Sequence, residues 1–135
     1  MNTEEIVPKK RQNPAAGPSI YYRGRSIAAK VLNRVLHGGA YSNIVLNNTL
    51  ADESLSAGDR RMATLLVYGV LRNLRLIDEV FRSKTRRGKI TASPALLLHA
   101  RMAIYEILFL KKTPKYATIS EYMKMAAGEA DRQET

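Results

Sequence analysis

The stretch from Ala95 to Leu110 restricts the fold of this chain most, because its apolar side chains point nearly all round a helix. Only a helix that is covered by neighbours on several sides can bury such a surface. Ser93 and Pro94, just before the stretch, are an N-cap residue and a favoured first helical residue. Pro114 stops the pattern shortly after it. The stretch therefore predicts a central helix inside a helical bundle.

Helical periods also precede this stretch. Apolar residues recur every three or four positions before Gly38–Gly39, which is expected to end the first helix. A short helix is expected after Tyr41, with Ile44 and Leu50 facing the core. Ser56 and Asp59 form a capping signal for the next helix. Its buried face is predicted to run through one long helix and to comprise Met62, Leu65, Leu66, Gly69, Val70, Asn73 and Ile77.

The last helical pattern follows Pro114. Thr118 and Glu121 are spaced as a capping box that would open a helix, and Gly128 would end it. No stretch alternates between apolar and polar residues as a strand does. We therefore predict an all-α protein, a compact bundle of about six helices.

The 135 residues are enough for one domain with short extensions. Residues 1–18 hold Pro14, Pro18 and the basic run Lys9–Arg11 without an apolar period, so we predict a flexible basic arm there. Residues 19–128 are then the helical domain, and residues 129–135 a polar tail. The polar first residues and the lack of a long apolar run lead us to expect a cytoplasmic protein without a membrane partner.

No residue pattern in the chain points to catalysis. The absence of cysteine excludes disulfides, thiolate metal sites and cysteine nucleophiles within this sequence. His37 and His99 are far apart, and we expect a helix end for the first and a packed position for the second. Glu106 is expected to be a buried ion-pair partner. Asp78 and Glu79 are adjacent and would point about 100° apart on a helix, so they do not converge. We predict no enzyme activity, no cofactor and no metal site.

Charge is the strongest functional signal. The chain has 22 Lys and Arg against 12 Asp and Glu, which gives a net charge of +10. Such an excess attracts polyanions, nucleic acid first among them.

The cationic residues also gather in rows on the predicted helices. Arg61, Tyr68, Arg72 and Arg75 would fall within about 80° of one another, and the group formed by Arg23, Lys30 and Arg34 within about 40°. Arginine pairs bidentately with phosphate and a tyrosine ring stacks on an unpaired base. We expect the rows to converge into one continuous face that binds single-stranded RNA, with Arg86 and Arg87 in a nearby basic run. The alternative interpretation is a solvated basic surface.

Four other tyrosines are expected to be structural. The rings of Tyr41, Tyr105, Tyr116 and Tyr122 are predicted to be buried, with their hydroxyls bonded at an edge. Gly69 in mid-helix is expected to mark a close crossing of two helices.

Several segments in a fixed order resemble a known family. They are Arg25 to Leu32, Ala40 to Asn43, Asp59 to Ala63, the block Leu66 to Arg72, Ile77–Asp78, Tyr105 to Leu110 and Pro114 to Glu121. Over residues 23 to 127 the sequence is similar to the NusB-like RNA-binding domain, in the version found at the N-terminus of the RsmB/Sun type of ribosomal RNA cytosine methyltransferase.

The resemblance implies a helical bundle of NusB-like type that binds structured or single-stranded RNA. In stand-alone members a basic first helix binds a leader RNA together with a ribosomal protein, in transcription antitermination. Carried over to this chain, that helix would contribute Arg23, Arg25, Lys30 and Arg34. In the methyltransferases the domain would help to place ribosomal RNA for a separate catalytic domain.

Two departures from the family pattern leave other functions open. The family continues with a helix bearing a Phe-Val-Asn-x-x-Leu pattern, which this sequence lacks, so we expect exposed apolar surface and self-association. No methyltransferase motif follows either. The alternatives are a detached or truncated N-terminal domain of a methyltransferase, a helical adaptor for a ribosomal protein or polymerase subunit, and, least favoured, a DNA-binding helix-turn-helix protein.

Overall fold

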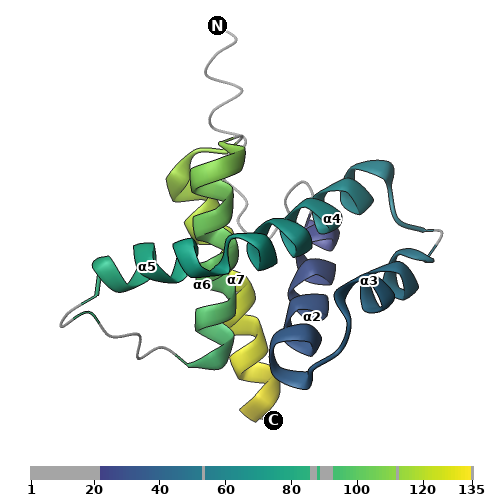
Figure 1. Ribbon diagram of the computed structural model, residues 1–135, viewed down its shortest axis with the longest axis horizontal. Helices are drawn as coiled ribbons and strands as arrows, with labels where there is room; N and C mark the ends of the chain where they lie inside the picture. The colour runs from purple at the N-terminus through teal and green to yellow at the C-terminus, as the bar shows by residue number, and fades with distance from the viewer. Residues whose placement is uncertain (1–21, 53, 86–87, 89–92, 112, 135) are drawn as a thin grey trace, which may run out of the picture.

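The computed structural model describes residues 22–52, 54–85, 88, 93–111 and 113–134. Helices dominate them (Figure 1), and these described residues contain no strand. The elements are α2 (Tyr22–Gly38), α3 (Ser42–Leu50), α4 (Ala57–Arg72), α5 (Leu74–Ser83), α6 (Pro94–Tyr105), the π-helical turn η2 (Glu106–Leu110) and α7 (Lys115–Glu134). The prediction of an all-α bundle with about six helices is confirmed. The predicted arm 1–18 lies outside the described residues.

The helices enclose one apolar core. In Figure 1, α6 and α7 run side by side, and α4 crosses them and is prolonged by α5. α2 packs against α4 and α6, and α3 packs against α2. The core residues come from all six α-helices, and the most deeply buried include Ala28, Leu32, Leu46, Leu66, Val67, Val70, Ile77, Met102 and Tyr122. The central position predicted for α6 is confirmed by its contacts with α2, α4, α5 and α7.

Two helix starts follow the sequence signals closely. The Ser56 hydroxyl accepts the N–H of Asp59 at 3.0 Å, and the Ser93 hydroxyl accepts the N–H of Leu96 at 3.2 Å, with Pro94 as the first helical residue. α2 ends at Gly38, and Gly39 has φ 71°, a conformation that favours glycine. Local capping chemistry therefore fixes these boundaries.

The long helix expected between Met62 and Ile77 is two helices. α4 ends at Arg72, and the Asn73 side chain donates a hydrogen bond of 2.8 Å back to the carbonyl of Gly69. An asparagine side chain that bonds the preceding turn competes with continued helix formation. α5 starts at Leu74, one residue after this break. Ile77 is buried as predicted, whereas Leu65 is exposed.

Three further expectations about the helices were wrong. In α3, Val45 and Leu46 face the core and Ile44 is exposed. α7 begins at Lys115, because the Pro114 carbonyl already accepts the N–H groups of Ala117 and Thr118. Thr118 is therefore a buried residue inside the helix rather than its cap. The helix also continues through Gly128 to Glu134.

Candidate nucleic-acid interface

A buried ion pair joins the first described helix to the end of the central one. Arg25 on α2 donates from Nε and Nη2 to the Glu106 carboxylate at 2.8 and 2.9 Å, and the Tyr122 hydroxyl donates to the same carboxylate. The Arg25 and Glu106 side chains are only 4% and 5% exposed. The Arg25 guanidinium also lies 5.7 Å from the centre of the Tyr122 ring.

The surroundings shift the pKa values of this cluster. Burial alone would lower the pKa of Arg25, but the hydrogen bond and negative charge of Glu106 outweigh it and raise that pKa. The pKa of Tyr122 is raised well above its usual value, by burial first and then by the charge and hydrogen bond of Glu106. Arg25 therefore stays charged and Tyr122 neutral at physiological pH.

This cluster corrects one predicted site residue. Arg25 was expected among the RNA-contacting residues, but its guanidinium is buried and bonded to a carboxylate, so a phosphate at the surface does not reach it. Two neighbouring predictions are confirmed: Glu106 is a buried ion-pair partner, and His99 is packed in the core with Nδ1 2.8 Å from the Ala95 carbonyl.

Three of the other predicted cations form a row on α2, which we call the α2 row: Arg23, Lys30 and Arg34. All three are exposed. Arg23 donates to Asp52 at 3.2 Å and to the Ser54 hydroxyl at 3.2 Å, which ties α2 to the segment after α3. The pKa of Asp52 is lowered, chiefly by the hydrogen bonds from Ser54 and then by Arg23. Among the described residues, no carboxylate pairs with Lys30 or Arg34.

The second predicted group, with the cations Arg61, Arg72 and Arg75, is divided between α4 and α5 by the break at Asn73. Arg61 and Arg72 are exposed on α4, with Tyr68 half-buried against the core between them. These three residues are the α4 row. Arg75 is also exposed, but it belongs to α5. No carboxylate among the described residues pairs with Arg61, Arg72 or Arg75.

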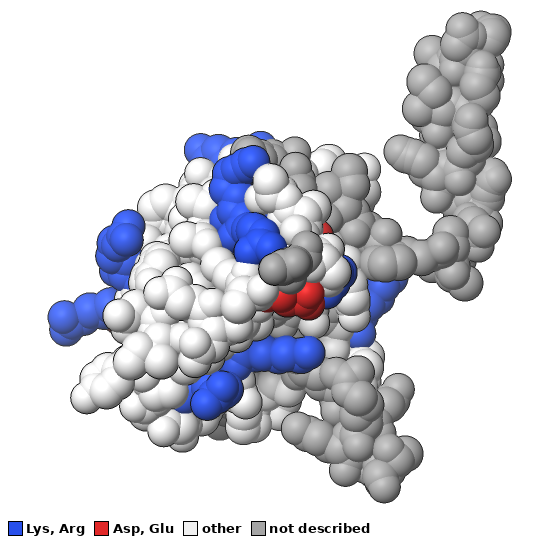
Figure 2. Space-filling model, turned by 90° about the vertical axis from the view of Figure 1, so that its right-hand side faces the viewer, with Lys and Arg blue, Asp and Glu red and all other residues white. Residues whose placement is uncertain are grey.

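The structure does not merge the two rows into one face. At 100° per residue, the side chains of each row lie on the side of their helix that is roughly opposite its buried residues. α2 and α4 pack against each other through those buried faces, at a point where a Cβ on Gly24 would lie 2.8 Å from the Asp59 carbonyl oxygen. Each row thus faces away from the other helix. Figure 2, which views the α2–α3 side, shows Lys and Arg side chains at several separate places.

Two further arginines pair with carboxylates. Arg101 forms a partly buried two-point pair with Asp78 at 2.8 and 2.9 Å, and Arg82 pairs with Glu79 at 3.5 Å. Asp78 and Glu79 therefore serve different arginines and do not converge, as predicted. The predicted residues Arg86 and Arg87 lie outside the described residues.

The aromatic residues divide into buried and exposed ones. Tyr105 and Tyr122 are buried as predicted, but the same prediction was wrong for Tyr41 and Tyr116, which are 75% and 77% exposed. Gly69 marks a close crossing as expected: a Cβ there would overlap the ring of Tyr105 on α6. Sequence reasoning did not single out Phe109, another exposed ring, which stacks on Tyr105.

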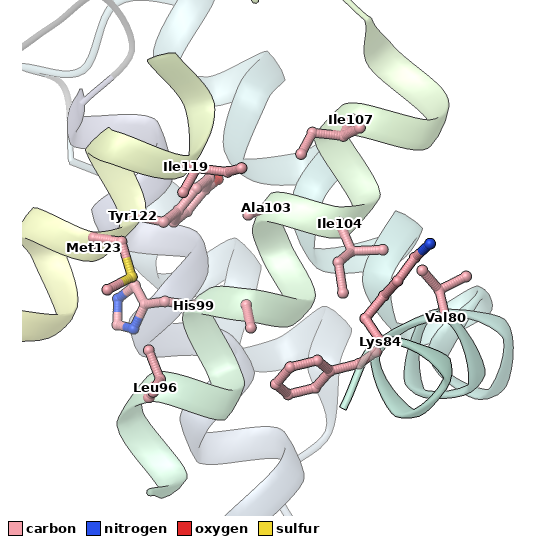
Figure 3. A pocket seen from close by; sticks show the side chains of 12 residues that line it. Val80, Lys84, Leu96, His99, Ala103, Ile104, Ile107, Ile119, Tyr122 and Met123 are labelled. Carbon is pink, nitrogen blue, oxygen red and sulfur yellow. The ribbon is translucent and has the colours of Figure 1, made fainter. Parts of the chain in front are cut away.

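An apolar groove lies between α5, α6 and α7. Its cavity measures about 260 Å³, and its lining includes Val80, Phe81, Leu96, Ile104, Ile119 and Met123. In Figure 3, Lys84 lies on the α5 side of the groove, and Ile119, Tyr122 and Met123 reach it from α7. Exposed apolar surface was expected from the sequence, and this groove supplies it.

Neither metal ligands nor a membrane span can be assigned. The described residues contain no group of three or more His, Cys, Asp or Glu side chains that could hold a metal ion. Within the same residues, no helix combines the length and the apolar character needed to cross a bilayer.

Known proteins similar to this chain fall into two groups. A family model described as the NusB family matches residues 23–134. A probable ribosomal RNA small subunit methyltransferase B of Bacillus subtilis (strain 168) is 29% identical over 102 residues, and its counterpart from Synechocystis is 26% identical over 102 residues. Each match covers 76% of this chain but only 23% of the methyltransferase. The transcription antitermination protein NusB of Trichlorobacter lovleyi is 28% identical, over 69% of this chain and 72% of that protein. No solved structure matches the chain.

Proposed function

This chain belongs to the NusB family, and from that membership we propose that it is a non-catalytic RNA-binding domain. The observation that carries the proposal is the presence of exposed cations without carboxylate partners among the described residues, on a protein with a net charge of +10. The RNA is single-stranded or structured RNA of the leader or ribosomal class, and a ribosomal protein is the expected protein partner.

The two rows contribute different cationic groups to RNA binding. On the α4 side, Arg61, Arg72 and the adjacent Arg75 offer planar guanidinium groups that pair bidentately with phosphate. On the α2 side, Lys30 supplies a compact point charge and Arg34 a further guanidinium group, and Arg23 is partly engaged by Asp52. Because the rows face away from each other, a short strand engages one row at a time. Affinity then comes mainly from counterion release.

Neutralising each row separately tests the proposal. One variant carries Arg61→Gln, Arg72→Gln and Arg75→Gln, and another carries Arg23→Gln, Lys30→Gln and Arg34→Gln. A third variant, with Lys84→Gln, Lys115→Gln and Lys124→Gln, removes the same charge from exposed positions elsewhere. Fluorescence anisotropy of a labelled single-stranded RNA measures binding, and circular dichroism checks that the helices persist.

We expect the RNA affinity to fall about tenfold or more in at least one row variant and to fall less in the lysine control variant. If all three variants bind equally well, non-specific attraction by net charge is sufficient and the rows are the wrong surface. If the wild-type chain does not bind RNA at all, the proposed function is wrong.

A more specific version makes the chain an RNA-targeting domain of a ribosomal RNA methyltransferase. The chain spans about a quarter of the length of the curated methyltransferases that it matches, which favours this version. It predicts that small-subunit ribosomal RNA fragments compete better than leader RNA for the chain. The reverse order would favour a role in transcription antitermination or regulation.

The apolar groove favours a second candidate function, a protein-interaction adaptor. Ile119 and Met123 expose apolar surface at the groove, and its lining is almost free of polar groups. If a protein partner binds in the groove, the Met123→Lys variant no longer captures it. Nuclease treatment leaves capture by the wild-type chain intact, and Met123→Lys binds RNA with unchanged affinity. A capture that survives Met123→Lys but not nuclease treatment would exclude this adaptor.

A further inference from the structure

We propose that Phe109 is a base-stacking residue for single-stranded RNA, placed beside the α4 row. This inference rests on the proposed RNA-binding function and names the group that would recognise a base rather than a phosphate. Sequence analysis assigned stacking to Tyr68, but that ring is half-buried against the core. Phe109 is 44% exposed.

The Phe109 ring is held in place from beneath. It stacks on Tyr105, with 5.1 Å between the ring centres and 25° between the ring planes. Tyr105 is itself buried between α4 and α6. A ring that is fixed on one face and open to solvent on another is pre-organised to stack on a base, because little side-chain freedom remains to be lost.

Contacts place this aromatic pair next to the α4 row. The Tyr105 ring lies against Gly69 so closely that a Cβ there would overlap it. Residues three and four positions away along a helix are surface neighbours, so Gly69 adjoins Arg72 and Leu65. Arg72 belongs to the α4 row and is exposed. Tyr105, on which Phe109 stacks, thus touches the helix that carries the α4 row one turn from Arg72, and the proposal places a base of a strand bound at Arg72 on the Phe109 ring.

The backbone around Phe109 is unusual in two ways. Phe109 lies in the π-helical turn Glu106–Leu110, where the Lys111 N–H reaches the Glu106 carbonyl at 2.9 Å. Lys111 then has φ 54°, a left-handed conformation that non-glycine residues rarely adopt. π turns and such outliers occur preferentially at functional sites. Here the π turn contains the exposed Phe109 ring, and the left-handed residue that follows the turn is the exposed Lys111.

A single exposed apolar side chain is also common on protein surfaces without a function. The two interpretations differ in what they predict for a strand that has phosphates but no bases. A stacking residue contributes to binding only when bases are present, whereas general surface or folding effects act on both strands alike.

The experiment compares two labelled strands of about twelve units, oligouridylate and an abasic phosphate strand of equal charge. Phe109→Ala and Phe109→Leu are measured beside Met123→Ala, which removes an apolar side chain of similar exposure from the groove. We expect Phe109→Ala to weaken oligouridylate binding roughly tenfold and to leave the abasic strand unaffected. Phe109→Leu should behave likewise, and Met123→Ala should match the wild type.

A fluorescent reporter provides a measurement that does not depend on affinity. The chain contains no tryptophan, so Phe109→Trp introduces a single one at the proposed contact. Oligouridylate should quench its emission and the abasic strand should not.

The outcomes distinguish failure of RNA binding from failure of base stacking at Phe109. If the wild-type chain binds neither strand, the proposed RNA-binding function fails, and this inference fails with it. If the chain binds RNA but the Phe109 variants lose affinity equally for both strands, or lose none, the function stands and the stacking role of Phe109 is overturned. Absence of base-dependent quenching in a variant that binds would likewise overturn it.

Discussion

Arg25 and Glu106, 81 residues apart in sequence, form a two-point ion pair with both side chains almost completely buried. The pair joins α2 to the π turn that ends the central helix, and Tyr122 from α7 completes it. Three helices therefore meet on one carboxylate. This arrangement makes Arg25 part of the core although it lies on a helix whose exposed side carries cations.

Removing one partner of this pair should destabilise the domain strongly. Arg25→Met leaves the Glu106 carboxylate buried without its counter-charge, which costs about 3–5 kcal/mol. Urea unfolding followed by circular dichroism measures the difference. Arg23→Gln is the matched control, because the exposed pair with Asp52 contributes about 1 kcal/mol or less.

The double variant Arg25→Met/Glu106→Leu distinguishes a lost charge pair from lost packing. It removes both charges, so it should be more stable than Arg25→Met alone. A free energy of unfolding for Arg25→Met within about 1 kcal/mol of the wild type would contradict the buried geometry.

Tyr122 should make the domain less stable at high pH. Its pKa in the folded protein is raised above the usual 10.0, whereas in the unfolded chain it ionises near that value. Above about pH 10 the unfolded state releases this proton and the folded state keeps it, so ionisation favours unfolding. Its contribution to stability is complete below pH 10 and is lost as pH rises towards the folded pKa.

Tyr122→Phe isolates this effect, because phenylalanine has no proton to lose. Urea unfolding at pH 8 and at about pH 11 should show a smaller decline in the free energy of unfolding for the variant than for the wild type. Equal declines would show that Tyr122 ionises alike in both states.

Gly69→Ala should destabilise the domain although alanine is the better helix former by about 1 kcal/mol. The new methyl group would overlap the Tyr105 ring, which is buried and packed on Phe109. Overpacking of this kind costs about 1–3 kcal/mol. Thermal unfolding measures the effect, with Gly38→Ala as the comparison, because the space around Gly38 is open. A rise in melting temperature for Gly69→Ala would show that α4 and α6 do not approach closely here.

The helical architecture was predictable because its signals are local. Ser56 and Ser93 bond backbone groups three residues away, and an all-round apolar stretch leaves few alternatives to a central helix. The break at Asn73 was missed because it depends on a side chain that bonds the preceding turn. The start of α7 was missed because Pro114 provides the first acceptor carbonyl, and the residues at Thr118 and Glu121 imitate a capping box.

The candidate site was only partly predictable, because one residue type has two roles in it. Arg23 and Arg25 are close in sequence, and only the second is buried. A signal was present: Ala28, Ala29 and Leu32 follow Arg25 by three, four and seven residues, so Arg25 lies on the apolar face. Phe109 lies in the π turn, for which the sequence carries no signal. The separation of the two cationic rows depends on how α2 and α4 pack.

The salt dependence of RNA binding measures how many phosphates the cationic rows neutralise. A strand long enough to reach both rows meets six cations, those of the α2 row together with Arg61, Arg72 and Arg75, and six phosphate contacts on such a strand give a slope of log affinity against log salt of about −4. Anisotropy titration of the full chain with labelled single-stranded RNA over a series of salt concentrations gives this slope. We expect a straight line near that value, and a slope about 2 units shallower for the variant that lacks Arg61, Arg72 and Arg75. Absence of binding, a flat response, or an unchanged slope in that variant would contradict this expectation.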